Sequence, residues 1–281
     1  MKNLKIICDS LSDIPKELVD KYDIEVVPLT VILDGKEYKD GIDISKDDFY
    51  KRLRGENAYP KTSQATYAQF KEVFDKYVNK GKSILYISGS SSATGTYQSA
   101  VMAKNDTEGD IYLYDSQTFT YLVGMLVIEA AKLSEEGKSI DEIIKSMDKL
   151  REKTYVLFSV DTLEYLQKGG RISSTKAAIG SILNIKPILN IKDGLVSSVC
   201  QVRGKKNVLS KMIDIIKENC GDNLDNEVIY IAYSDDFKER ERFTKIVEEE
   251  FNPKKIEYFQ IGTVIGSHAG PGLTGIVCFK K

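Results

Sequence analysis

The chain contains a single histidine, His268, in the stretch GSHAGPGLTG from Gly266 to Gly275. Histidine is the residue type whose unperturbed pKa lies closest to neutral pH, so this position is a first candidate for binding or acid–base chemistry. The surrounding glycines predict a flexible loop, exposed at one side. This pattern fits two interpretations. The histidine either donates to a nearby carbonyl in a turn or contacts a bound anion.

Hydroxyl side chains gather between Ser88 and Ser99, in the stretch SGSSSATGTYQS. This stretch, the serine loop, follows the apolar run SILYIS and leads into a predicted helix. Backbone N–H groups at a helix start favour an anion, and serine and threonine hydroxyls can donate to it as well. The pattern therefore predicts a site for a carboxylate or a phosphate.

Two shorter segments have a similar composition, and each allows two interpretations. Thr62 and Ser63, in PKTSQ, are either further donors to an anion or part of a cap for a helix near Thr66. Arg171, after the paired glycines 169 and 170, is either a solvated surface charge or a guanidinium held at a binding site.

Several familiar sites do not match the sequence. It has no GxxxxGK[ST] phosphate loop and no GxSxG nucleophile elbow. The four cysteines lie far apart, at positions 8, 200, 220 and 278, and no second histidine is present, so no metal site is expected. A hydrolase that uses a serine of the 88–99 loop with His268 remains an alternative to a pure binding protein.

The elements that must position these residues alternate between strands and helices in the first half of the chain, which predicts a parallel sheet with helices on its faces. Asp34-Gly35 and Asp193-Gly194 are predicted hairpin turns. The second half predicts a mixed sheet, and a small-residue helix is expected over residues 174–184. The expected fold class is thus α/β with two domains: an N-terminal, doubly wound, mostly parallel domain over 1–155 and a C-terminal mixed-sheet domain over 156–281.

Composition limits the function classes. The chain has 281 residues and a net charge of −2, from 40 basic and 42 acidic side chains, which argues against nucleic-acid binding driven by bulk charge. No apolar run approaches the length of a membrane span, and the N-terminus lacks a signal-peptide core, so a cytoplasmic protein is expected.

Taken together, these segments resemble the DegV family of bacterial fatty-acid-binding proteins. The resemblance runs along the whole chain, through DSLSD, PKTSQATYAQF, SSSATGTYQSA, Asp115-Ser116, LEYLQKGGRIS, VRGKK and GSHAGPGLTG. It implies one long-chain fatty acid in a tunnel between the two domains, and no cofactor. It also implies a partner, a separate ATP-dependent fatty acid kinase that converts the presented carboxylate to acyl-phosphate for lipid metabolism. A transient contact with a membrane surface is a further expectation.

The resemblance also assigns residue roles. The carboxylate is expected to contact Thr62, Ser63, Ser91, Thr94, Gly95 and His268. Arg171 is expected near the head group, and Arg203 with Lys205 is expected to dock the kinase, although a basic cluster is also common on solvated surfaces. Two departures affect the pocket near the head group: Ala65 replaces the usual proline after TSQ, and Ser92-Ala93 replaces glycine-leucine in the serine loop.

Overall fold

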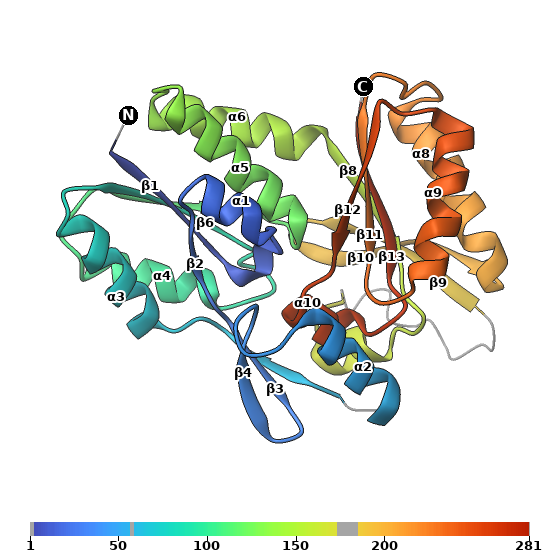
Figure 1. Cartoon of the computed structure of the whole chain (residues 1–281), viewed down its shortest axis with the longest axis horizontal. Coiled ribbons are helices and arrows are strands. Elements are labelled where there is room, and N and C mark those ends of the chain that lie inside the picture. The colour runs from blue at the N-terminus through green and yellow to red at the C-terminus, as the bar shows by residue number, and fades with distance from the viewer. Residues whose placement is uncertain (1–2, 57–58, 173–184, 281) are drawn as a thin grey trace. The chain divides into compact units, whose positions relative to one another are not determined.

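The computed structural model describes residues 3–56, 59–172 and 185–280 (Figure 1). The chain divides into two compact units: unit 1 comprises residues 1–45 and 60–152, and unit 2 comprises residues 46–59 and 153–281. The helix expected over 174–184 lies outside the described residues. Among the described residues, no helix combines the length and hydrophobicity that a membrane span requires.

Unit 1 is built on a parallel sheet whose described strands have the order β2-β1-β6-β7. These strands are β1 (Leu4–Asp9), β2 (Glu25–Val27), β6 (Ser83–Ser88) and β7 (Ile111–Asp115). Successive strands add first on one side of β1 and then on the other, so the strand order reverses between β1 and β6. Such a reversal is where ligands bind in doubly wound sheets, outside the carboxyl ends of the strands.

Helices lie on both sides of this sheet, with α3 and α4 on one side and α5 and α6 on the other (Figure 1). The helices of unit 1 are α1 (Lys16–Lys21), α3 (Tyr67–Val78), α4 (Thr96–Asn105), α5 (Tyr121–Glu135) and α6 (Ile140–Lys153), with a short 3-10 helix η1 (Ser10–Ser12) after β1. Nonpolar side chains from β1, β6, α5 and α6 form the core between the sheet and this helical layer. The doubly wound parallel domain is confirmed.

A second, antiparallel sheet in unit 1 has the order β4-β3-β5. Its strands are β3 (Thr30–Leu33), β4 (Lys36–Lys39) and β5 (Lys61–Ser63). Asp34 and Gly35 have φ angles of 53° and 75° in the turn that joins β3 to β4. Both residues lie in the left-handed region that such a hairpin turn requires, so the turn prediction is confirmed.

Unit 2 contains a mixed sheet, whose described strands run in the order β10-β9-β8-β13-β11-β12. The strands are β8 (Thr154–Ser159), β9 (Ile185–Lys192), β10 (Leu195–Arg203), β11 (Val228–Tyr233), β12 (Lys255–Gln260) and β13 (Thr274–Phe279). Of the strand pairs described in this sheet, β11 and β12 are parallel and the others are antiparallel. Asp193 and Gly194 form the predicted turn between β9 and β10, with φ angles of 52° and 74°.

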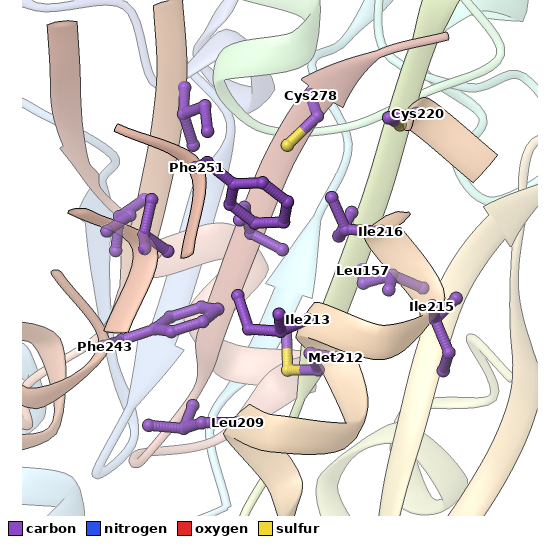
Figure 2. Packing of buried hydrophobic residues seen from close by; sticks show 14 of the residues in the cluster. Leu157, Leu209, Met212, Ile213, Ile215, Ile216, Cys220, Phe243, Phe251 and Cys278 are labelled. Atoms are coloured by element: carbon purple, nitrogen blue, oxygen red, sulfur yellow. The ribbon is translucent and has the colours of Figure 1, made fainter. Parts of the chain in front are cut away.

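The core of unit 2 lies between this sheet and two amphipathic helices, α8 (Val208–Cys220) and α9 (Phe237–Phe251). Leu209, Met212 and Ile216 of α8, Phe243 of α9 and Leu157 of β8 all belong to this cluster of buried side chains (Figure 2). The other helices among the described residues of the unit are α2 (Lys46–Glu56), α7 (Glu164–Gly169), α10 (Thr263–Ala269) and the 3-10 helix η3 (Lys205–Asn207).

Helix α2 belongs to unit 2, which differs from the expected division at a single boundary near 155. Phe49 and Tyr50 are at most 1% exposed. The Tyr50 hydroxyl donates to the carbonyl of Ile261 at 3.1 Å, and Lys46 Nζ donates to the carbonyl of Gln260 at 2.7 Å. Burial of these side chains against the end of β12 therefore places an early segment of the chain in the C-terminal unit.

Candidate functional site

The serine loop begins at the carboxyl end of β6, the strand between β1 and β7. The last residues of these three strands are Asp9, Ser88 and Asp115. Ser88 is paired with Asp115 in the β6–β7 register, so the three polar side chains end at the same edge of the sheet. This edge includes the reversal of strand order between β1 and β6, where a doubly wound sheet binds ligands.

Asp9 is completely buried beneath the start of the serine loop. Its Oδ2 accepts hydrogen bonds from the Tyr86 hydroxyl at 2.6 Å and from the Gly89 N–H at 3.3 Å, and Oδ1 accepts from the Leu11 N–H at 3.0 Å. Burial raises the pKa of Asp9 to about 6, although these hydrogen bonds favour the ionised form. Asp9 thus holds the start of the loop through the N–H group of Gly89.

Asp115 holds the same loop from the other neighbouring strand. Its Oδ1 accepts from the N–H groups of Ser91 at 3.1 Å and Gln117 at 3.0 Å, and its Oδ2 accepts from the Ser91 hydroxyl at 2.5 Å. Ser91, although exposed, therefore donates its hydroxyl proton within the protein. A contact of Ser91 with a ligand carboxylate stays a prediction.

The second half of the serine loop enters α4 through Thr94 and Gly95. The Thr94 hydroxyl lies 2.9 Å from that of Thr96 and accepts from the Thr96 N–H at 3.2 Å. Gly95 is the N-cap of α4 and makes no side-chain cap hydrogen bond. The first N–H groups of a helix have no partner within the helix, and here they lie beside the threonine hydroxyls. The arrangement can hydrogen-bond an anion.

Gln64 brings the Thr62-Ser63 segment beside the serine loop. Its Nε2 donates to Ser99 Oγ at 3.0 Å, and a β-carbon on Gly95 would lie only 2.1 Å from its Oε1. Thr62 is half-buried and Ser63 is exposed, both in β5. Thr66 caps α3 with its own hydroxyl, which leaves the hydroxyls of Thr62 and Ser63 outside the cap.

The expected flexible loop around His268 is instead the short helix α10, which corrects the prediction. Gly266 lets this helix pack closely against α2, because a β-carbon there would lie 2.5 Å from the Tyr50 hydroxyl and 2.9 Å from Phe49. Tertiary packing has overridden the low helix propensity of glycine. Gly270, with φ of 75°, ends the helix against the ring of Tyr165.

Within unit 2, the His268 ring lies directly on Gly169, where a β-carbon would come within 2.3 Å of Nδ1. The Arg171 guanidinium donates to the carbonyl of Gly169. Burial, together with the nearby positive charge of Arg171, lowers the pKa of His268 to about 4. The structure thus brings the GGR and histidine motifs together, and it keeps the imidazole neutral at physiological pH.

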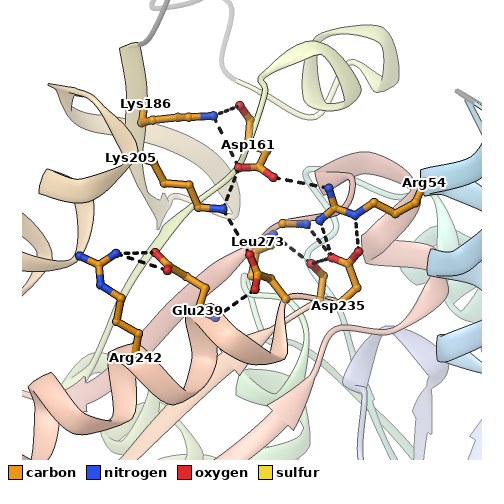
Figure 3. Close-up of polar contacts among 11 residues, drawn as sticks. Arg54, Asp161, Lys186, Lys205, Asp235, Glu239, Arg242 and Leu273 are labelled. Carbon is orange, nitrogen blue, oxygen red and sulfur yellow. Dashed lines mark hydrogen bonds and ion pairs between the residues drawn. The ribbon is translucent and has the colours of Figure 1, made fainter.

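Ion pairs that the sequence did not predict connect α2 to the end of β11 (Figure 3). Arg54 contacts Asp235 through Nε at 2.6 Å, and Asp235 also accepts from the Gly272 N–H at 2.8 Å. Burial alone would raise the pKa of Asp235, but the hydrogen bonds from Arg54, Gly272 and Ser234 outweigh it and lower that pKa. Only the spatial contact identifies this cluster, because its members lie far apart in sequence.

The predicted docking residues have different surroundings. Arg203, at the end of β10, is exposed. Lys205 takes part in the ion-pair cluster, at 3.4 Å from Asp161 and 3.3 Å from Asp236 (Figure 3). Lys206 is exposed, and its carbonyl accepts from Arg242 at 3.2 Å. Arg203 is therefore the better placed of the two predicted residues for contact with another protein.

In the part of the chain that the structure describes, no three His, Cys, Asp or Glu side chains are grouped closely enough to hold a metal ion.

Comparisons with known proteins all point to the same family. Residues 3–281 match a family model described as an uncharacterised protein, DegV family. A DegV domain-containing protein of Caldanaerobacter subterraneus is 39% identical, with the alignment covering 100% of both chains.

Solved structures are similar over nearly the whole length. One is a DegV family protein from Thermus thermophilus, whose description states fatty acid binding. It is 30% identical to this chain with a TM-score of 0.88, and the match covers 99% of this chain and 100% of that one. A stearic acid-binding protein of Eubacterium ventriosum is 29% identical with a TM-score of 0.87, covering 99% and 98%.

Proposed function

Because the chain belongs to the DegV family, we propose that it binds one long-chain fatty acid and presents the carboxyl group to a separate ATP-dependent kinase. The observation that supports binding most directly is the similarity to the Thermus thermophilus protein, whose description states fatty acid binding. On this proposal the chain carries the substrate, and the kinase supplies the phosphoryl group that yields acyl-phosphate.

The serine loop supports a head-group site in unit 1. We assign the carboxylate to the hydroxyls of Thr94, Thr62 and Ser63 and to the helix start at Gly95. A carboxylate removed from water costs several kcal/mol unless donors replace its hydration, and Gln64 holds two donor-rich segments side by side. For His268 and Arg171 we retain the head-group role that the family resemblance implies, with His268 as a neutral donor.

The acyl chain should supply most of the affinity. Burial of about a dozen methylene groups at ~0.8 kcal/mol each gives on the order of 10 kcal/mol before entropy costs. Such a ligand should co-purify. Mass spectrometry of lipid extracted from the denatured protein should therefore detect a long-chain fatty acid, and protein that neither carries nor takes up fatty acid would contradict the proposal.

A Thr94→Val variant tests the head-group assignment, because valine keeps the shape but removes the hydroxyl. We expect fatty acid affinity to fall about tenfold, the loss that corresponds to one hydrogen bond with a charged group. Thr107→Val, beyond the other end of α4, removes a hydroxyl that donates to the Ala103 carbonyl and is the matched control. Equal affinities of the two variants would contradict the assignment.

Arg203 tests the kinase partnership. Arg203→Glu should leave lipid content and melting temperature unchanged, while acyl-phosphate formation with the cognate kinase falls at least about tenfold, because surface charge mainly sets encounter and orientation. Lys245→Glu makes the same type of charge reversal at an exposed position of α9 and should keep the full rate. A full rate for Arg203→Glu at low salt would remove Arg203 from the docking surface.

The hydrolase alternative is tested by the same protein preparations. A chromogenic ester should not be turned over, because the proposal leaves the chemical step to the kinase. Turnover that is lost in a Ser91→Ala variant would favour the hydrolase over the carrier.

A further inference from the structure

Three consecutive N–H groups of the serine loop donate to acceptors of unit 1 itself. Gly89 donates to Asp9 Oδ2 at 3.3 Å, Ser90 donates to the carbonyl of Thr118 at 3.0 Å, and Ser91 donates to Asp115 Oδ1 at 3.1 Å. Two carboxylates, one at the end of each neighbouring strand, thus hold the first turn of the loop from both sides.

Ser91 makes the closest of these contacts. Its hydroxyl has a single proton, which it donates to Asp115 Oδ2 at 2.5 Å. While this bond exists, the oxygen can offer a ligand only its lone pairs. A second carboxylate at the same hydroxyl would also lie close to the negative charge of Asp115, which is unfavourable.

The fixed first turn determines where Thr94 lies. The N–H groups of Ala93 and Thr94 both donate to the carbonyl of Ser90, at 3.1 and 3.2 Å, and the Ser92 N–H donates to Ser90 Oγ at 3.3 Å. Ser90 is itself held between Gly89 and Ser91. Displacement of Ser91 from Asp115 would therefore move the turn that carries Thr94.

We propose that Asp115, acting through Ser91, is a positioning residue for head-group recognition, and that Ser91 is a loop anchor and not a donor to the ligand. This inference rests on the proposed fatty acid binding. It assigns to the pair the task of holding Thr94 and Gly95 in the orientation that accepts the carboxylate.

A double-mutant cycle tests the proposal. Ser91→Ala, Asp115→Asn and the double variant are delipidated, and their affinities are measured for a long-chain fatty acid and for the alcohol of the same chain length. Each single variant should weaken acid binding by about fivefold to tenfold, and the double variant by no more than either single one, because the same contact is lost. Alcohol binding should change much less than acid binding, which a general loss of folding would not produce.

Ser139→Ala, which removes a serine hydroxyl that donates to the Glu142 carboxylate just before α6, is the matched control and should bind like the wild type. If Asp115→Asn fails to fold, the Ser91→Ala variant still tests the proposal through the ratio of its affinities for the acid and for the alcohol. Weakening by Ser91→Ala with unchanged or tighter binding by Asp115→Asn would overturn the proposal, because Ser91 would then donate to the ligand directly. Unchanged binding in both variants would also overturn it. A wild type that binds no fatty acid would instead refute the proposed function, and this inference with it.

Discussion

The two units hold their candidate residues by different means. In unit 1, the carboxylates of Asp9 and Asp115 accept backbone N–H groups of the serine loop, and one of these carboxylates is completely buried. In unit 2, the helix that carries His268 packs through glycines against aromatic rings, and the imidazole is neutral. The comparison indicates that hydrogen bonds to carboxylates hold the unit 1 loop and that close packing holds the unit 2 helix.

A Gly270→Ala substitution should have the largest effect and tests the importance of shape in unit 2. Gly270 has φ of 75°, and an added β-carbon would lie 2.4 Å from the Tyr165 ring. With ψ of 180°, this backbone conformation is essentially restricted to glycine, and its strain together with overpacking should lower the free energy of unfolding by about 2 to 6 kcal/mol. Gly170→Ala is the control at an open, ordinary left-handed position, where φ is 67°, ψ is 24° and no atom crowds the added β-carbon, so a strain of about 1 kcal/mol is expected. Urea titrations measure both, and equal losses would remove the packing argument.

Asp9→Asn tests the ionic character of unit 1. The folded-state pKa of Asp9 is raised from 3.8 to about 6, so the folded chain gains its proton before the unfolded chain does as the pH falls. The Asp9 contribution therefore stabilises the wild type as pH falls from 7 to about 4.5, by roughly 2 kcal/mol, and Asn lacks this dependence. Urea unfolding of both chains at the two pH values gives the difference, and parallel pH profiles would contradict the raised pKa.

His268 provides the smallest and most direct test. As the only histidine, it gives one set of imidazole NMR signals, whose titration midpoint should lie near the lowered pKa of about 4. The unfolded chain takes up this proton at higher pH, so the His268 contribution to stability is lost as pH falls below about 6.5. Arg171→Gln should raise the midpoint by less than about one pH unit, since burial remains the larger cause. A midpoint near 6.5 in the wild type would refute the buried, neutral imidazole.

The features that sequence predicted best are those set by local chemistry. Asp34-Gly35 and Asp193-Gly194 adopt the left-handed angles of hairpin turns, and the alternating strands and helices of unit 1 form the expected parallel sheet. Helix α10 was not predictable, because Gly266 is helical through its contact with Tyr50, a residue more than 200 positions earlier. Local composition contains no signal for such a contact.

The candidate site shows the same division. The hydroxyls of the serine loop and of the Thr62-Ser63 segment were identified from residue type and from their place before helices. The contact between Ser91 and Asp115 requires the order of β6 and β7 in the sheet, which the sequence does not state. Arg54 and Asp235, which are 181 positions apart, likewise meet only in the folded unit.

Helix α2 has a consequence for synthesis on the ribosome. Tyr50 bonds to Ile261, 211 positions later, and Phe49 beside it is fully buried in the finished unit. At about 5 to 20 residues per second, the partners of α2 emerge roughly 10 to 40 s after the helix itself. During that interval its apolar face has no native surface to cover it. The nascent chain should therefore expose an aggregation-prone helix until its last strands are made, and chains that terminate early would keep that helix exposed.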